Sequence, residues 1–201
     1  MNIVCLDLEG VLVPEIWINF AEKTGIEELR LTTREVPDYD VLMKSRIEIL
    51  KQHELKLSDI QEVIASMEPL QGAREFLETL RSLTQVVILS DTFTEFAQPL
   101  MKKLGYPTLW CNDLIVDSQG MICNYRMRLH DGKKKAIRAL KELNFRTFAA
   151  GDSYNDLTMI HEADGGCLFR APERILLEEP NLKLTITYDE FLQEVKEFLN
   201  A

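Results

Sequence analysis

Three continuous apolar runs in this chain each end in an aspartate, and this repetition constrains the fold more than any other feature. The runs are NIVCLD at residues 2–7, QVVILSD at 85–91 and RTFAAGD at 146–152. Unbroken aliphatic runs of this length are typical of strands buried on both faces of a sheet. Shorter strand candidates follow at 165–169 and 184–188. Amphipathic helical patterns lie between or after these runs, at 71–83, 93–104, 133–143, 154–162 and 188–199. Alternating strands and helices predict an α/β fold with a doubly wound, mostly parallel sheet.

Two segments interrupt this alternation. Residues 14–70 contain no convincing strand, and we therefore expect a helical domain inserted after the first strand, with residues 1–13 and 71–201 forming the core. The second interruption, residues 108–129, has two β-rich halves around the sequence DSQG, and Gly120 suits the turn of a β-hairpin. The helical patterns expected within the insertion are 14–24, about 26–32, 38–52 and 58–66.

Composition and charge exclude several classes of protein. The 201 residues are 46% hydrophobic and 28% charged, as in a soluble globular protein with one domain or one domain and an insertion. A net charge of -10 argues against a nucleic-acid partner, because binding to the phosphate backbone needs a basic face. No apolar run approaches the roughly 20 residues that cross a bilayer, and the N-terminus lacks a signal-peptide pattern. We therefore expect no membrane partner and a cytoplasmic location.

The three strongest predicted strands all deliver polar residues to their carboxyl ends: Asp7 and Glu9, Ser90 and Asp91, and Asp152 and Asp156. The carboxyl ends of parallel strands meet at one edge of a sheet, where ligands bind. Several carboxylates gathered there repel one another unless a cation holds them, and Mg²⁺ prefers such oxygen ligands. The sequence therefore favours a magnesium site open to a substrate phosphate. Alternatively, Asp152, Asn155 and Asp156 could serve as caps of the following helix.

Hydroxyl and cationic side chains beside this edge are candidates for binding phosphate. Ser90 precedes a predicted helix, where it could cap the helix or donate a hydrogen bond to a phosphate oxygen. Lys133, Lys134 and Lys135 open another predicted helix. Because the helix dipole disfavours cations at that end, we expect at least one of these lysines to face an anion and the others to face solvent.

Two charged residues of the insertion are candidates for binding a small substrate. Arg46 falls on the apolar stripe of the helix predicted at 38–52. It either extends to the edge of that stripe or reaches into a cavity to bind an anion. Glu15 follows Pro14 at the start of the first predicted helix of the insertion, where it could simply complement the helix dipole. The pattern alone leaves both alternatives open.

The motifs at the strand ends resemble those of a known enzyme family. CLDLEGV resembles the first motif of the haloacid dehalogenase superfamily, D-x-D-x-[TV]; LSDT resembles the second motif, Lys133 the third and GDSYND the fourth. The resemblance covers essentially the whole chain and implies a Rossmann-like core with a small helical cap, acting as a Mg²⁺-dependent phosphatase. Within the superfamily the chain looks most like phosphoserine phosphatases, and closer still to those that are also phosphoserine:homoserine phosphotransferases.

The resemblance implies a role for each matching residue near the phosphate. Asp7 matches the nucleophile that becomes an aspartyl-phosphate. Glu9 matches the general acid/base, and its backbone carbonyl matches a magnesium ligand. Ser90 and Lys133 match the groups that bind the transferring phosphoryl oxygens. The residues that match the magnesium site are Asp7, Glu9 through its carbonyl, Asp152, and Asp156 as a support behind the ligands or through a water.

Further residues match the part of the pocket that holds the substrate. Glu15 and Arg46 match cap residues that bind the amino and carboxylate groups of phosphoserine. Asn155 matches a residue near the phosphate. Asp91 and Thr92 are expected to border the substrate, because they follow Ser90 directly.

Two departures from the family pattern concern the acceptor of the phosphoryl group. Glu9 stands where the family usually has Asp, and the extra methylene lengthens the side chain by about 1.5 Å. Asp91 and Thr92 stand where glycines commonly follow the serine. Both departures argue against strict hydrolysis to water, and the resemblance implies transfer to homoserine as well, with small molecules as the partners and no prediction of oligomeric state. Two alternatives stay open: a phosphatase for another small phosphomonoester, such as a sugar or nucleotide phosphate, and a non-enzymatic phospho-ligand sensor.

Overall fold

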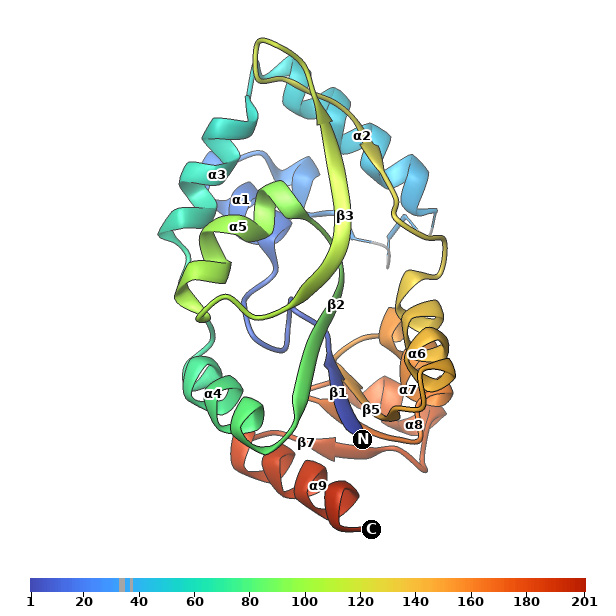
Figure 1. Ribbon diagram of the computed structural model, residues 1–201. Coiled ribbons are helices and arrows are strands. Elements are labelled where there is room, and N and C mark those ends of the chain that lie inside the picture. The colour runs from blue at the N-terminus through green and yellow to red at the C-terminus, as the bar shows by residue number, and fades with distance from the viewer. Residues whose placement is uncertain (33–34, 37) are drawn as a thin grey trace.

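One mixed sheet forms the centre of the computed structural model (Figure 1), which describes residues 1–32, 35–36 and 38–201. Thr33, Arg34 and Pro37 belong to the predicted insertion but lie outside the described residues. The strand order is β4-β3-β2-β1-β5-β6-β7, and only the pair β3 and β4 is antiparallel. The predicted mostly parallel sheet is therefore confirmed. The strands are β1 Asn2–Leu6, β2 Gln85–Phe93, β3 Leu109–Val116, β4 Ile122–Arg126, β5 Arg146–Gly151, β6 Gly165–Phe169 and β7 Lys183–Thr185.

Strand β1 lies in the middle of the sheet. This position explains why its sequence is continuously apolar instead of alternating between apolar and polar residues. Val4 pairs in parallel register with Val86 of β2 and Phe148 of β5. Successive residues of β1 point to opposite faces, and both faces are buried: Val4 joins one hydrophobic cluster and Cys5 joins the other. This central position brings Asp7, the next residue after β1, to the middle of the carboxyl edge.

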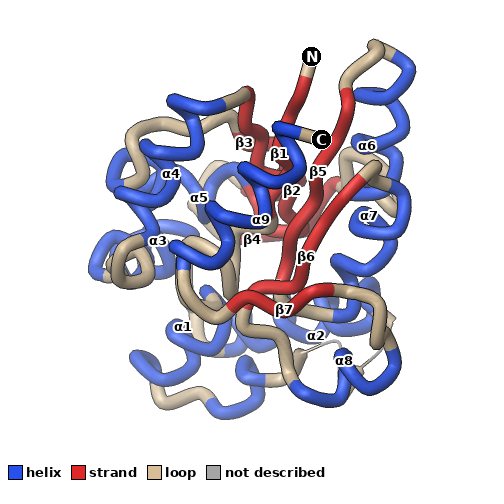
Figure 2. The backbone as a smooth tube through the Cα atoms, turned by 90° about the horizontal axis from the view of Figure 1, so that it is seen from below, coloured by secondary structure: helices blue, strands red, loops and turns tan. Residues whose placement is uncertain are grey.

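Helices cover both faces of the sheet, as the alternating pattern predicts (Figure 2). Helices α4, α5 and α9 contribute Phe76, Phe96 and Phe191 to the larger cluster on one face. Helices α6, α7 and α8 contribute Ile137, Ile160 and others to the cluster on the opposite face. The bounds are α4 Ala73–Leu83, α5 Thr94–Lys103, α6 Gly132–Glu142, α7 Leu157–Glu162, α8 Glu173–Glu178 and α9 Tyr188–Asn200.

Several predicted elements differ from those observed. Strand β2 continues to Phe93, and the segment predicted as one helix over 154–162 is a 3₁₀ turn, η2 (Tyr154–Asp156), followed by α7. The strand predicted at 184–188 is shorter, because Thr187 caps helix α9. Helix α8 was not predicted, since six residues are too few to show a helical period.

The insertion between β1 and α4 is helical, as predicted. It contains α1 Ile16–Thr24, the 3₁₀ helix η1 Glu27–Arg30, α2 Tyr39–Gln52 and α3 Leu57–Ser66. The side chain of Asp38 accepts hydrogen bonds from the first N–H groups of α2, which fixes where that helix begins. The division into a core (1–13 and 71–201) and a helical domain (14–70) stays a prediction.

The predicted hairpin is present as β3 and β4, and it extends beside helices of the insertion (Figure 1). Gly120 turns the chain with a φ of 85°. Its carbonyl accepts a hydrogen bond of 2.9 Å from the N–H of Leu57, the first residue of α3. Tyr125 of β4 donates from its hydroxyl to Asp40 of α2 at 2.8 Å. The hairpin thus contacts two helices of the insertion. In the part of the chain that the structure describes, no helix is both long and apolar enough to span a membrane.

We expect Lys103→Met to lower the free energy of unfolding by about 2 kcal/mol, a typical value for hydrogen bonds from a charged donor. Lys103 Nζ, on α5, donates to the carbonyl oxygens of Ala65 and Met67 at 2.9 and 2.6 Å, near the end of α3. Urea denaturation measures the loss. The exposed neighbour Lys102 supplies the control: Lys102→Met should change stability by less than about 0.5 kcal/mol. Equal losses of stability in both variants would contradict specific stabilising hydrogen bonds between α5 and α3.

Candidate active site

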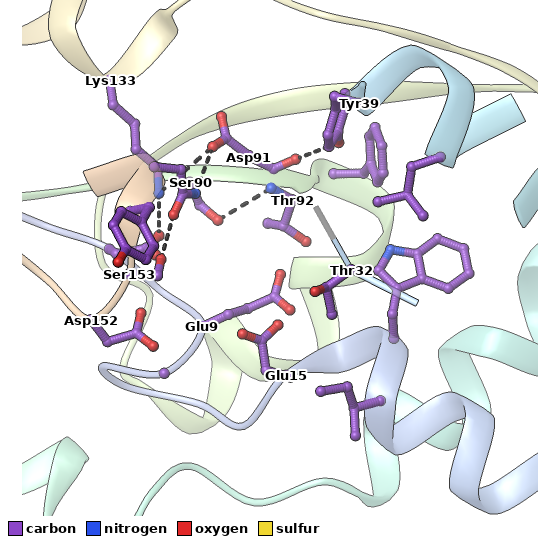
Figure 3. Close-up of a pocket in the computed structure, with 18 of the residues that line it drawn as sticks. Glu9, Glu15, Thr32, Tyr39, Ser90, Asp91, Thr92, Lys133, Asp152 and Ser153 are labelled. Atoms are coloured by element: carbon purple, nitrogen blue, oxygen red, sulfur yellow. Dashed lines mark hydrogen bonds and ion pairs between the residues drawn. The ribbon is translucent and has the colours of Figure 1, made fainter. Parts of the chain in front are cut away.

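The carboxyl ends of β1, β2 and β5 open into one pocket together with helices of the insertion (Figure 3). Its volume is about 340 Å³, which suits a small molecule. Most of the residues that the sequence singled out line it: Asp7, Glu9, Glu15, Arg46, Ser90, Asp91, Thr92, Lys133, Asp152 and Asn155. Asp156, by contrast, is fully buried and lies behind this lining.

Lys133 is the buried centre of the charged groups in this pocket. Its Nζ lies 2.7 Å from Asp156 Oδ1, 3.0 Å from Asp7 Oδ1 and 3.7 Å from Asp91 Oδ2. Burial alone would lower the pKa of Lys133, but the charges of Asp156, Asp7 and Asp91 outweigh it and hold that pKa well above its ordinary value. Lys133 is therefore the lysine of the triplet 133–135 that faces anions.

Asp7 is buried and its pKa is raised well above the ordinary value, first by burial and then by the charge of Asp156. Lys133 opposes this shift. One oxygen, Oδ1, accepts a hydrogen bond from the N–H of Leu8 at 2.8 Å and pairs with Lys133. No described residue donates a hydrogen bond to the other oxygen. Asp7 therefore combines a fixed carboxylate with one oxygen available to a ligand.

Asp156 both fixes a loop and faces the charged centre. Its Oδ2 accepts the N–H groups of Asp152 and Ser153 at 3.0 and 3.1 Å, while Oδ1 pairs with Lys133. A Cβ on Gly151 would lie 2.2 Å from Asp156 Cγ, so glycine is required there. The capping interpretation of GDSYND is correct for Asp156, which forms a capping box with Ser153. It does not compete with a role in the site, because the two carboxylate oxygens serve different partners.

Three carboxylates form a group that could hold a metal ion: oxygens of Asp7, Asp152 and Asp156 all lie within 4.8 Å of one another. Burial and the charge of Asp156 raise the pKa of Asp152 to about 7. No other described residue donates a hydrogen bond to the Asp152 carboxylate. It lies against Gly10, where a Cβ would come within 2.4 Å of it. This all-oxygen donor set fits a hard divalent cation.

Glu9 is half-buried and held by the insertion. Its Oε2 accepts the N–H of Ile16, the first residue of α1, at 2.8 Å, and Thr92 contributes a side-chain hydrogen bond. Burial and the charge of Glu15 raise the pKa of Glu9 to about 7, although these hydrogen bonds and Arg46 act in the opposite direction. A carboxyl with this pKa exchanges a proton readily near neutral pH. The sequence did not reveal the contact with Ile16.

Ser90 does not cap helix α5, so that interpretation is wrong. Strand β2 runs on to Phe93, which takes the N-cap position of α5. Ser90 is buried, and its Oγ accepts the N–H of Thr92 at 3.2 Å. Asp91 accepts a hydrogen bond of 3.1 Å from the side chain of Asn155, which joins the second and fourth motifs.

Arg46 lies inside the insertion rather than at its edge. It is only 6% exposed, and Nη2 donates to the carbonyl of Leu31 at 2.7 Å. Its Nε is buried and has no hydrogen-bond partner among the described residues. Burial lowers the pKa of Arg46 to about 10, so it stays cationic at neutral pH. Glu15 precedes α1 without a side-chain hydrogen bond to the helix and lines the pocket.

Sequence reasoning assigned no role in the pocket to its aromatic residues, among them Tyr39 and Trp17. Tyr39, noted only as part of an apolar stripe, donates from its hydroxyl to the carbonyl of Asp91 at 3.1 Å. The face of Trp17 lies 4.5 Å from the guanidinium carbon of Arg46. The apolar stripe correctly predicted that Tyr39 faces the hydrophobic core. The hydrogen-bond partner of its hydroxyl is a backbone atom, which no sequence pattern identifies.

The chain is similar to several known proteins. A family model described as haloacid dehalogenase-like hydrolase matches residues 1–164. The chain is 57% identical over its full length to phosphoserine phosphatase ThrH of Pseudomonas aeruginosa, covering 97% of that protein. It is also 57% identical to phosphoserine phosphatase of Pseudomonas syringae pv. tomato, covering 84% of it. A crystal structure of phosphoserine phosphatase in apo form has the same fold, with a TM-score of 0.78, 23% identity, and coverage of 96% of this chain and 98% of that one.

We expect Lys133→Gln to lower the free energy of unfolding at pH 8 by about 3 kcal/mol, because it leaves buried carboxylates without their cation. The loss should be smaller at pH 5. Burial already raises the pKa of Asp7, and without the lysine this carboxyl takes up its proton more readily. Urea denaturation in EDTA at both pH values measures the difference. Lys135→Gln, on the exposed side of α6, should cost less than about 0.5 kcal/mol at either pH. A loss independent of pH would contradict the role of Lys133 as counter-charge.

Proposed function

Because this chain belongs to the haloacid dehalogenase-like hydrolase family, we propose that it is a Mg²⁺-dependent L-phosphoserine phosphatase that works through a phosphorylated Asp7. We propose that it also passes the phosphoryl group to homoserine. The observation that carries the proposal is a single pocket with Asp7 and Lys133 at the sheet edge and the buried cation Arg46 in the insertion. Such a pocket suits a molecule with a phosphate at one end and a carboxylate at the other. The names of the two Pseudomonas relatives support the same substrate.

In the first step, the available oxygen of Asp7 attacks the phosphorus of phosphoserine. An O–P bond to Asp7 forms while the bond from phosphorus to the serine oxygen breaks. The departing serine oxygen takes the proton of Glu9, whose pKa of about 7 leaves an appreciable fraction protonated near neutral pH. Lys133 and the hydroxyl of Ser90 offset the charge of the transferring phosphoryl oxygens. The products of this step are serine and the aspartyl-phosphate.

In the second step, the Glu9 carboxylate accepts a proton from the incoming acceptor. The oxygen of that acceptor attacks the phosphorus and displaces the carboxylate of Asp7. Water gives inorganic phosphate, and homoserine gives phosphohomoserine. Either route restores the Asp7 carboxylate and the protonated Glu9, so the two steps form a closed cycle.

The donors available for Mg²⁺ are the carboxylates of Asp7 and Asp152 and the backbone carbonyl of Glu9. Asp156 supports them, because it holds the N–H groups of Asp152 and Ser153. When bound, Mg²⁺ neutralises negative charge on the phosphoryl group and on the carboxylates around it. Any side chain at Gly10 would collide with the Asp152 carboxylate, so glycine there leaves room for this ligand.

The insertion supplies the groups for the amino-acid end of the substrate. The Arg46 guanidinium binds the carboxylate, and Glu15 binds the amino group, since each has the opposite charge. Asp91, Thr92 and Asn155 line the pocket between these groups and the sheet edge. On this proposal residues 14–70 act as a cap over a core made of 1–13 and 71–201.

We expect the purified protein to release phosphate from L-phosphoserine with Mg²⁺ and to lose this activity in EDTA. Asp7→Asn should abolish turnover, because an amide does not form an acyl phosphate. Labelled phosphoserine should leave a phosphoprotein that hydroxylamine cleaves, in the native protein but not in Asp7→Asn. Adding homoserine should divert label from inorganic phosphate to phosphohomoserine. Failure to turn over phosphoserine would overturn the proposal, and turnover without phosphohomoserine would remove only the transferase activity.

We expect Glu9→Gln to slow the release of serine by about 100-fold or more, a typical contribution of a general acid. The same variant should still release one equivalent of nitrophenolate per site from p-nitrophenyl phosphate in a rapid burst, since this weakly basic group leaves without a proton. Rapid-mixing kinetics with both substrates make the comparison. Glu9→Asp, which keeps the acid on a shorter side chain, is the control and should retain part of the serine release. A lost nitrophenolate burst in Glu9→Gln would contradict a role in proton transfer alone.

A further inference from the structure

Arg46 has fewer partners than a buried guanidinium usually needs. Nη2 donates to the carbonyl of Leu31 at 2.7 Å, Nη1 contacts the sulfur of Met43 at 3.7 Å, and Nε has no partner among the described residues. One hydrogen bond and one long contact to sulfur do not by themselves fix the plane of the guanidinium. Because Arg46 has several rotatable bonds and five donors, its use as a carboxylate ligand depends on what fixes that plane.

Trp17 contacts the flat face of this guanidinium. The distance from Arg46 Cζ to the centre of the Trp17 ring is 4.5 Å, which is a cation–π contact. Trp17 is the second residue of α1 and is only 8% exposed. A ring against one face fixes the guanidinium plane while leaving the donors at its edge uncovered by the ring.

Trp17 is in turn fixed to the core. Its ring meets the ring of Phe96 of α5 edge to face, with centroids 5.4 Å apart, and Phe96 meets Phe93 in the same way at 5.6 Å. Phe96 is fully buried, and Phe93 ends strand β2 three residues after Ser90. A continuous row of aromatic rings therefore connects Arg46 with the strand that carries the phosphate-binding serine.

We propose that Trp17 is a positioning residue for the amino-acid end of the substrate. It sets the plane of Arg46 and, through Phe96 and Phe93, the location of that plane relative to Ser90. The ligand that depends on it is the carboxylate of an amino-acid phosphomonoester. This inference rests on the proposed function, because it takes Arg46 as the carboxylate ligand, and it adds a residue that determines specificity without touching the reacting atoms.

The test compares Trp17→Leu, which removes the ring face, with Trp17→Phe, which keeps an aromatic face. The probes are L-phosphoserine as substrate and O-phosphoethanolamine, which lacks only the carboxylate, as a competitive inhibitor. We expect Trp17→Leu to raise KM for phosphoserine about tenfold while kcat falls less than about threefold, which corresponds to loss of binding rather than of chemistry. The inhibition constant of phosphoethanolamine should stay within about twofold, and Trp17→Phe should keep KM within about threefold of the native value.

Arg46→Met provides a second, independent readout. If Trp17 acts through Arg46, adding Trp17→Leu to Arg46→Met should not raise KM further. If the two residues act independently, the free-energy effects of the two substitutions on KM should add. An equal rise of KM and of the phosphoethanolamine inhibition constant, or a full effect of Trp17→Leu in the Arg46→Met background, would overturn the inference. Should Trp17→Leu fail to fold, Trp17→Met, which also removes the aromatic face but keeps more of the side-chain volume, is tested in both backgrounds with the same expected outcomes. A native protein that turns over phosphoserine while Trp17→Leu leaves KM unchanged would overturn this inference alone; a native protein without that turnover would overturn the proposed function as well.

Discussion

The ion pairs of Lys133 with Asp7 and Asp156 are the interaction on which the site depends. Lys133 is almost fully buried, and so are both carboxylates. Removing such charges from water is costly unless each has an opposite partner at hydrogen-bond distance. The sheet satisfies this condition because β1 and β5 are neighbours, and α6 brings the lysine to their carboxyl ends. The same three side chains also set the electrostatic field in which a phosphoryl group would lie.

Much of the fold and the site could be predicted from the sequence because the signals are local. Buried parallel strands need continuous apolar runs, and the polar residues that follow them must meet at one edge. These two rules alone predict that Asp7, Ser90 and Asp152 lie together. Arg46 on an apolar stripe was also informative, since a charged residue there needs a partner or a cavity.

What could not be predicted depends on contacts between segments far apart in the chain. The hydrogen bond from Ile16 to Glu9 requires the turn at 8–13, whose geometry has no clear sequence pattern. The role of Ser90 was ambiguous because the same residue types occur at the end of a strand and at the start of a helix. The pairing of Phe93 with Asn112 of β3 extends β2 beyond Ser90. Tyr39 uses a backbone partner, which no pattern of side chains reveals.

The β3–β4 hairpin attaches the insertion to the core beyond the two chain connections between them. Leu57 of α3 donates to Gly120 in the turn of the hairpin, and Tyr125 of β4 donates to Asp40 of α2. Lys103 and Tyr39 add hydrogen bonds between the core and the insertion at other places. Because a single hydrogen bond contributes only about 1 kcal/mol, the insertion keeps its place over the pocket through many weak contacts rather than one strong one.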